Sequence, residues 1–189
     1  GPSANGMAFR VADAKAAYDL ALSRGAKAAD ASQSAFPEAY VLEGIGGSML
    51  YLVDRFGDAG TIYDAWEQIP GAVEAEAANN VGLDVLDHLT HNVYRGNMDK
   101  WWDFYRELFG FKQIHFFDID GRITGLVSRA ITSPCGKIRI PLNESKDETS
   151  QIVEYLKKYK GEGIQHIAVG TDGIYDATDK LADNGVKFM

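Results

Sequence analysis

Two histidines stand at matching places in two widely separated strings of this sequence. His88 opens "HLTHNV" and His166 opens "HIAVGT", and apolar residues that favour β-strands surround both. Successive side chains of a strand point to opposite faces, so His88 and His91 should lie on opposite faces of one strand. The two histidines of "HLTH" therefore do not form a chelating pair. The candidate pair is His88 with His166.

Two neutral imidazoles that converge inside a curved sheet suit a divalent transition metal. With one carboxylate they would complete the facial triad of non-haem Fe(II) oxygenases. The alternative is that each is a lone core histidine held by a hydrogen bond, and for either histidine taken singly this alternative is favoured. The equivalence of the two positions in a repeat moves the balance towards a metal, and both interpretations stay open.

Three segments share one pattern, in which a short apolar strand is followed by a helix and a glycine that leads into another strand. They are residues 6–27, 87–111 and 165–188. Aligned on their opening strands, the first segment has Ala8 where the other two have histidine. Strand-like runs follow the first two helices. The sequence therefore predicts strand–helix–strand–strand–strand modules and an α+β fold.

The predicted helices carry start and stop signals. Asp13 and Asp172 are candidate N-caps of the first and third helices, which Gly25 and Gly185 end. The second helix has an apolar stripe at 3.6-residue spacing, made of Met98, Trp101, Trp102, Tyr105, Leu108 and Phe109. Strands are expected at 38–44, 47–54, 110–120, 122–131 and 136–143, and a further helix at about 148–159.

Bulk composition excludes several function classes. The formal net charge of −8 argues against binding to a phosphate backbone, so no nucleic-acid partner is expected. The apolar runs fall far short of the roughly twenty residues that cross a bilayer, and no leader pattern opens the chain. The single cysteine, Cys135, excludes an internal disulfide and lies in a turn sequence. A cytoplasmic enzyme fits best.

Several strings resemble the 4-hydroxyphenylpyruvate dioxygenase family, which is built from vicinal-oxygen-chelate modules. They include "LDHLTHNVYRGNM", "FYRELFGF", "SPCGKIRIPLNES", "SQIVEYL" and "GEGIQHIA". "GMAFRV" and "GIGGSMLYLVDRFG" are similar to the non-catalytic N-terminal half of the family. The resemblance implies repeated βαβββ modules of the vicinal-oxygen-chelate (glyoxalase/dioxygenase-like) type, incomplete at both ends.

The resemblance also implies a division of the chain. Residues 1–68 would be the second module of the non-catalytic half, and residues 69–84 a linker. Residues 85–189 would contain a catalytic-half module (85–145) and the start of the next module (146–189).

Candidate site residues follow from the same resemblance. His88 and His166 match the two iron-binding histidines of the family, and polar residues that match its substrate pocket are Ser128, Asn143, Gln151 and Gln165. The third iron ligand of the family, a glutamate near its C-terminus, has no match here and is expected beyond the chain end. Glu144 and Glu162 lie near matching strings, but nothing aims either carboxylate at the metal.

Each pocket residue also has a structural alternative. Ser128 can be a buried hydroxyl bonded to a neighbour, and Asn143 can cap a turn. Gln151 begins a predicted helix and can be a capping residue. Strict alternation places Gln165 on the face opposite His166.

The family resemblance implies an Fe(II) enzyme that converts 4-hydroxyphenylpyruvate and O2 to homogentisate and CO2 in tyrosine catabolism. The full-length family implies a homo-oligomer, and this chain alone is expected to lack turnover. One alternative is a dioxygenase like hydroxymandelate synthase, which shares the substrate and the iron site. The other is a metal-free module of the same superfamily that binds a small ligand.

Overall fold

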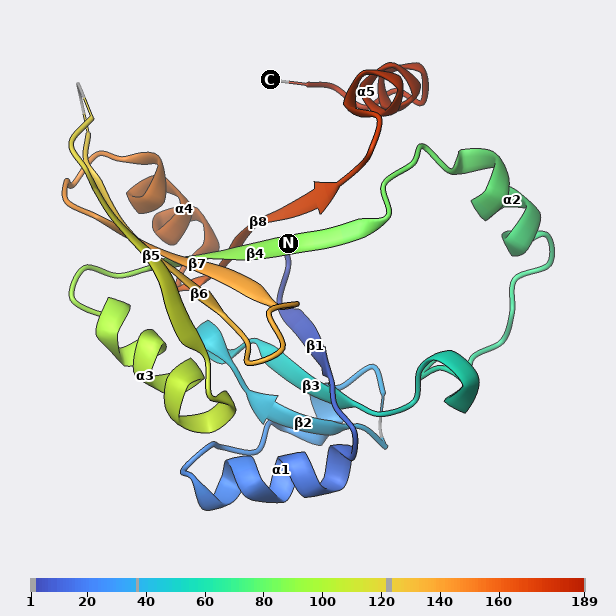
Figure 1. Cartoon of the computed structure of the whole chain (residues 1–189), viewed down its shortest axis with the longest axis horizontal. Coiled ribbons are helices and arrows are strands. Elements are labelled where there is room, and N and C mark those ends of the chain that lie inside the picture. The colour runs from blue at the N-terminus through green and yellow to red at the C-terminus, as the bar shows by residue number, and fades with distance from the viewer. Residues whose placement is uncertain (1–2, 37, 122–123, 189) are drawn as a thin grey trace.

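A computed structural model describes residues 3–36, 38–121 and 124–188 of the chain. Two sheets form, and some of the helices pack beside them while others lie apart (Figure 1). The smaller sheet has the order β1-β3-β2, in which β1 and β3 are parallel and β2 is antiparallel to β3. Its elements are β1 (Gly6–Arg10), α1 (Ala14–Ser23), β2 (Tyr40–Glu43) and β3 (Met49–Val53).

The larger sheet has five strands in the order β5-β6-β7-β4-β8. Its elements are β4 (Val85–Val93), α3 (Met98–Phe109), β5 (Lys112–Ile119), β6 (Leu126–Thr132), β7 (Arg139–Ser145), α4 (Gln151–Tyr159), β8 (Gly163–Gly170) and α5 (Ile174–Asp183). From β4 to β7 they form one full strand–helix–strand–strand–strand module. The predicted module and the α+β class are therefore confirmed. The first two residues of the predicted strand 122–131 lie outside the described residues.

The first copy is shorter than the module pattern. Among the described residues, the only strands that follow α1 in this copy are β2 and β3. The chain then passes through a 3-10 turn at Gly57–Ala59 and reaches α2 (Ala72–Asn79). Helix α2 lies inside the predicted linker 69–84, and Figure 1 shows it apart from both sheets. No residue of α2 is buried, so no apolar periodicity marked it as a helix. Its alanines and glutamates favour a helix through intrinsic propensity alone.

The predicted caps meet different outcomes. Asp13 is the N-cap of α1 and accepts a hydrogen bond from the backbone N–H of Ala16. Asp172 does not cap α5, because Gly173 occupies the N-cap position and no side chain accepts there. The helix starts one residue later than the prediction.

No helix in the described part of the chain is long and apolar enough to cross a membrane.

One hydrophobic core joins the two halves of the chain. The ring of Phe9 on β1 meets Phe109 and Phe111, at centroid distances of 5.3 and 5.9 Å. The guanidinium of Arg24, just after α1, donates to the carbonyl oxygen of Leu108 at 3.0 Å. That bond satisfies one of the free carbonyls in the last turn of α3.

Helix α3 packs the predicted apolar stripe against the larger sheet, where it meets a buried histidine. Nε2 of His91 lies 2.7 Å from the hydroxyl oxygen of Tyr105, and both side chains are fully buried. Burial lowers the pKa of His91 to about 3, so the ring is neutral. His91 belongs to the core, on the face of β4 that points to α3. The predicted separation of His88 from His91 is thus confirmed.

Gly46 provides a close contact between the halves. It has a φ of +59°, and a Cβ added to it would lie 1.9 Å from the backbone oxygen of Glu162, just before β8. Only glycine combines that backbone angle with that approach. Gly47 also has a positive φ, +81°, but an added Cβ would meet nothing within 4 Å.

Gly46→Ala should therefore destabilise the fold far more than Gly47→Ala. Both substitutions strain the backbone, which costs about 1 kcal/mol. Only Gly46→Ala also forces the backbone at Glu162 to move, which raises the total cost to roughly 3 kcal/mol or more. Urea unfolding of both variants measures the difference. Equal losses of stability would show that the contact with Glu162 contributes nothing.

The buried His91 predicts an acid-sensitive core. Its folded pKa is lowered from 6.5 to about 3, so the unfolded chain binds the extra proton between these values. The neutral, buried ring of His91 makes its full contribution to the free energy of unfolding above pH 6.5. As the pH drops below 6.5 towards 3, this contribution falls by about 1.4 kcal/mol per pH unit. Urea unfolding between about pH 6 and pH 5 should show a shallower pH slope for His91→Gln than for the unsubstituted chain. An unchanged slope contradicts this prediction.

Candidate functional site

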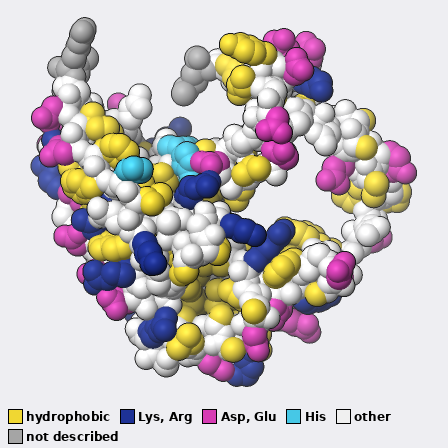
Figure 2. All heavy atoms as spheres, viewed as in Figure 1, with side chains coloured by type: hydrophobic (Ala, Val, Ile, Leu, Met, Phe, Trp, Pro, Cys, Tyr) yellow, Lys and Arg dark blue, Asp and Glu magenta, His cyan; other side chains and the backbone are white. Residues whose placement is uncertain are grey.

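The two candidate histidines lie side by side on adjacent strands. β4 and β8 pair antiparallel, with His88 opposite Ala168 and Thr90 opposite His166. His88 and His166 are therefore diagonal neighbours on one face of the sheet. Their ring centroids are 5.6 Å apart, with an angle of 74° between the ring planes. Figure 2 shows histidine side chains at the molecular surface beside acidic and basic ones.

A chain of charged contacts fixes His88. Oδ2 of Asp87 lies 2.6 Å from Nδ1 of His88, and Oδ1 accepts from the guanidinium of Arg139 at 2.7 Å. The hydrogen bond with His88 lowers the pKa of Asp87, and the charge of Arg139 adds to this effect. A carboxylate at Nδ1 keeps the proton on that nitrogen, so the lone pair of Nε2 is free to bind a metal.

Neutral groups hold His166. Its Nδ1 is hydrogen bonded to Oε1 of Gln165, and its Nε2 lies 2.9 Å from Oγ1 of Thr90. Partial burial, and then the neighbouring His88, lower the pKa of His166, which favours the neutral ring. The hydroxyl of Thr90 donates to the Nε2 lone pair when Nδ1 carries the proton. A metal bound at Nε2 would take the place of this hydroxyl.

A β-bulge precedes each histidine. Asp87 and Gln165 have no partner in the pairing of β4 with β8, and each is hydrogen bonded to Nδ1 of the histidine that follows it. The bulge at Gln165 breaks the strict alternation of side chains. The expectation that Gln165 lies apart from His166, based on that alternation, is therefore wrong. The sequence did contain a signal for these contacts, because a polar residue directly precedes each histidine in "LDHLTH" and in "IQHIAV".

Ser128 and Asn143 continue the histidine face across the sheet. Ser128 on β6 opposes Asn143 on β7, which in turn opposes Asn92 on β4, two residues from Thr90. The Oδ1 atoms of Asn92 and Asn143 are buried and lack a hydrogen-bond partner in the described structure. Buried acceptors without partners are uncommon, and such atoms can receive a hydrogen bond from a ligand. Sequence reasoning did not select Asn92.

Gln151 lies elsewhere. It is exposed at the first position of α4, and the N-cap is Ser150, whose hydroxyl accepts from the backbone N–H of Val153. Gln151 is therefore not the cap. Within the described residues no hydrogen bond joins it to the histidine face, and its role in a pocket stays a prediction.

The two glutamates near the site support α3. Oε2 of Glu144 accepts from the backbone N–H of Met98 at 3.1 Å. Glu162 is buried and accepts from Trp101 of α3 and from two donors just before that helix. No group of three His, Cys, Asp or Glu side chains that could hold a metal is found in the described parts of the chain. The histidine pair could thus supply two ligands to a metal, and no third candidate ligand lies beside the pair in the described residues.

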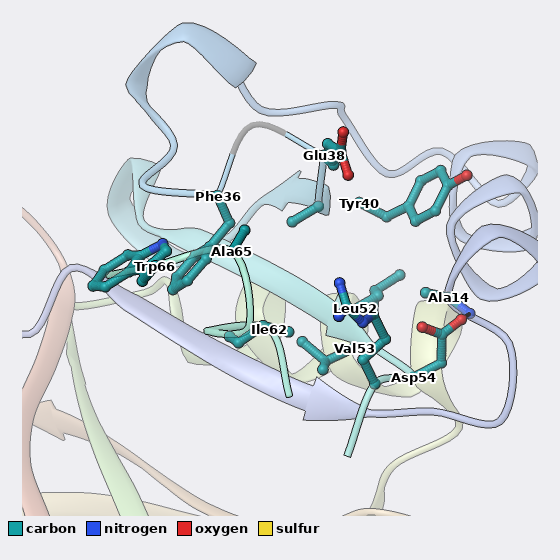
Figure 3. A pocket seen from close by; sticks show the side chains of 12 residues that line it. Ala14, Phe36, Glu38, Tyr40, Leu52, Val53, Asp54, Ile62, Ala65 and Trp66 are labelled. Carbon is teal, nitrogen blue, oxygen red and sulfur yellow. Dashed lines mark hydrogen bonds between the residues drawn. The ribbon is translucent and has the colours of Figure 1, made fainter. Parts of the chain in front are cut away.

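Two hollows differ in their relation to the histidines. One, of about 620 Å³, lies beside β8 and is lined by residues that include Gln165, His166 and Tyr155. The other, of about 380 Å³, lies in the N-terminal half, where Phe36 and Trp66 stack above β3 (Figure 3). No histidine lines this second hollow, and the carboxylate of Asp54 at its edge accepts from the first N–H of α1. The first hollow therefore adjoins the candidate site through His166 and Gln165, although His88 is not among the residues that line it.

Known families match both halves of the chain. The family described as "Glyoxalase/Bleomycin resistance protein/Dioxygenase superfamily" matches residues 85–189, and the one described as "Hydroxyphenylpyruvate dioxygenase, HPPD, N-terminal" matches residues 1–67.

Named relatives align with the whole chain. It is 57% identical to "4-hydroxyphenylpyruvate dioxygenase" of Pseudomonas aeruginosa and 52% identical to "Hemolysin VllY" of Vibrio vulnificus, in each case over 100% of this chain and 53% of the relative. The chain thus spans about half the length of these curated relatives. A solved structure, a mutant of 4-hydroxymandelate synthase from Streptomyces coelicolor, superposes with a TM-score of 0.79 at 25% identity, over 97% of this chain and 53% of that one. The chain belongs to the glyoxalase/bleomycin resistance protein/dioxygenase superfamily.

Proposed function

We propose that this chain is a piece of an Fe(II)-dependent 4-hydroxyphenylpyruvate dioxygenase, which converts 4-hydroxyphenylpyruvate and O2 to homogentisate and CO2. The observation that carries the proposal is the meeting of His88 and His166 on adjacent strands, with ring centroids 5.6 Å apart and Nδ1 of each ring held by the residue before it. The identity of 57% to a relative of that name supports the same reaction.

The residues present fit two of the three protein ligands of such a site. His88 and His166 would hold the iron, and the carboxylate that completes the triad is expected outside the described residues. When bound, the iron would take up the α-keto acid of the substrate and activate O2. The carboxylate of Asp87 fixes the tautomer of His88 and makes its Nε2 a stronger electron-pair donor to a metal.

The remaining site residues would receive the organic substrate. We assign Ser128, Asn143 and Gln165 to its pocket, because the first two lie in register on the histidine face and the third contacts His166. The unpartnered Oδ1 atoms of Asn92 and Asn143 are suited to accept a hydrogen bond from the phenol hydroxyl of the substrate. For Gln151, a role in the pocket is supported only by the resemblance to the 4-hydroxyphenylpyruvate dioxygenase family.

The proposal includes the wider organisation of the protein. Residues 1–68 are assigned to the non-catalytic half and 69–84 to a linker, with a catalytic module at 85–145 and the start of the next at 146–189. A homo-oligomer in the cytoplasm, acting in tyrosine catabolism, follows from the family resemblance.

A hydroxymandelate synthase is the second candidate reaction. This reaction is expected to use the same substrate and the same metal. The TM-score of 0.79 to the solved 4-hydroxymandelate synthase supports it. Its identity to this chain is 25%, against 57% for the named 4-hydroxyphenylpyruvate dioxygenase. Homogentisate is therefore the favoured product.

Metal binding tests the proposal. The chain should bind one Co(II), used as a spectroscopic probe for Fe(II), and His88→Ala should weaken binding by at least about ten-fold, because one of only two imidazole ligands is lost. His115→Ala is the matched control, since His115 lies on β5 beside Phe117, away from the pair. Titration followed by the visible Co(II) spectrum measures both affinities. Equal affinity of His88→Ala and the unsubstituted chain would favour a metal-free module.

A turnover assay provides a separate test. With Fe(II), ascorbate and 4-hydroxyphenylpyruvate, the chain alone should release no homogentisate, because its described residues lack the third ligand. Robust product formation would refute this assignment of ligands.

A further inference from the structure

The strand that carries His166 is held in a pairing that skips one residue. Ile164 opposes His91, and the next pair is His166 with Thr90, so that Gln165 is left over. Regular pairing from Ile164 would set Gln165 opposite Thr90. His166 would then point to the other face of the sheet, away from the histidine that it meets in the structure. The bulge therefore decides whether the two rings can share a metal.

A tyrosine of α4 holds the backbone at this bulge. The hydroxyl of Tyr155 donates to the carbonyl oxygen of Ile164 at 3.0 Å, directly before the bulge residue. A side-chain donor stabilises the strand here because a bulge interrupts the ladder of backbone hydrogen bonds. The approach is close, since a Cβ added to Gly163 would lie 2.8 Å from Oη of Tyr155 and 2.5 Å from Cε1 of Tyr159. Glycine at this position lets α4 reach β8.

A buried carboxylate fixes the end of β8 at which the pairing begins. Glu162 is 6% exposed, and its Oε1 accepts from the side chain of Asn97 at 2.8 Å and from the backbone N–H of Tyr94 at 2.9 Å. Its Oε2 accepts from the indole N–H of Trp101 at 2.8 Å. Tyr94 directly follows β4 and Glu162 directly precedes β8, so this hydrogen bond ties the start of β8 to the end of β4. Its three donors compensate for the burial of the charge.

We propose that Tyr155 and Glu162 are positioning residues that hold the Gln165 bulge and thereby set the face of β8 on which His166 lies. The inference rests on the proposed function, in which His166 is a metal ligand, and it adds two residues that the comparison with the family did not select. Gly46 contributes by packing against the backbone of Glu162, so that the N-terminal half supports the same point.

Tyr155→Phe tests the proposal, because it removes one hydroxyl and keeps the ring. Tyr159→Phe is the matched control, since this ring stacks on Tyr155 at a centroid distance of 5.1 Å and its hydroxyl makes no hydrogen bond in the described part of the chain. NMR of the whole 189-residue chain measures the nuclear Overhauser effect between the rings of His88 and His166. The effect should be strong in the control and weakened by about half or more in Tyr155→Phe.

Co(II) affinity is the second measurement. It should fall by about ten-fold in Tyr155→Phe and stay unchanged in Tyr159→Phe, as expected for a residue that orients a metal ligand from outside the ligand set. Glu162→Gln should lower it too, whereas Glu144→Gln, which also removes a carboxylate that accepts from the first turn of α3, should not. Circular dichroism confirms that each variant is folded.

The outcomes separate this proposal from the proposed function. If Tyr155→Phe retains both the ring–ring contact and the Co(II) affinity of Tyr159→Phe, the positioning role is overturned. If the unsubstituted chain binds no Co(II) while the ring–ring contact still depends on the Tyr155 hydroxyl, the metal site fails and the positioning role stands.

Discussion

The antiparallel pairing of β4 with β8 is the constraint on which the candidate site depends. His88 lies opposite Ala168 and His166 opposite Thr90, so each histidine faces the residue two positions beyond the other. This is the relation expected between two equivalent strands about a two-fold axis. The repeat in the sequence thus has a direct physical meaning, because equivalent positions near the middle of two paired strands become diagonal neighbours.

The bulges follow the same symmetry and explain how the rings are oriented. Asp87 and Gln165 hold equivalent places, and leaving each of them unpaired brings its side chain to Nδ1 of the next histidine. A regular ladder would satisfy more of the backbone and place each of these two side chains on the face opposite to that of the histidine that follows it. The loss of regular pairing is offset by side-chain partners such as the hydroxyl of Tyr155. The site is therefore supported by α4 as well as by the sheet.

The spacing of apolar residues predicted those features of the fold that depend on which face of a strand or helix is buried. It separated His88 from His91, located the buried face of α3, and identified a full module from β4 to β7. It failed for Gln165, because a bulge changes the phase of alternation and leaves no mark in hydrophobicity. Helix α2 escaped for a related reason, since a helix without a buried face has no amphipathic pattern. Asn92 was passed over because its place beside Asn143 depends on the parallel pairing of β4 with β7.

Although the backbone relates the histidines symmetrically, their surroundings differ, which would make them unequal ligands in the proposed metal site. His88 is backed by a carboxylate that an arginine also holds, whereas His166 is backed by a neutral amide and has its second nitrogen bonded to Thr90. A carboxylate partner makes an imidazole a stronger donor than an amide does. In the proposed site, Nε2 of His88 would be free to bind the metal, whereas Nε2 of His166 would first have to release the hydroxyl of Thr90. The first copy has Ala8 at the equivalent place, so the same strand geometry there supplies no ligand.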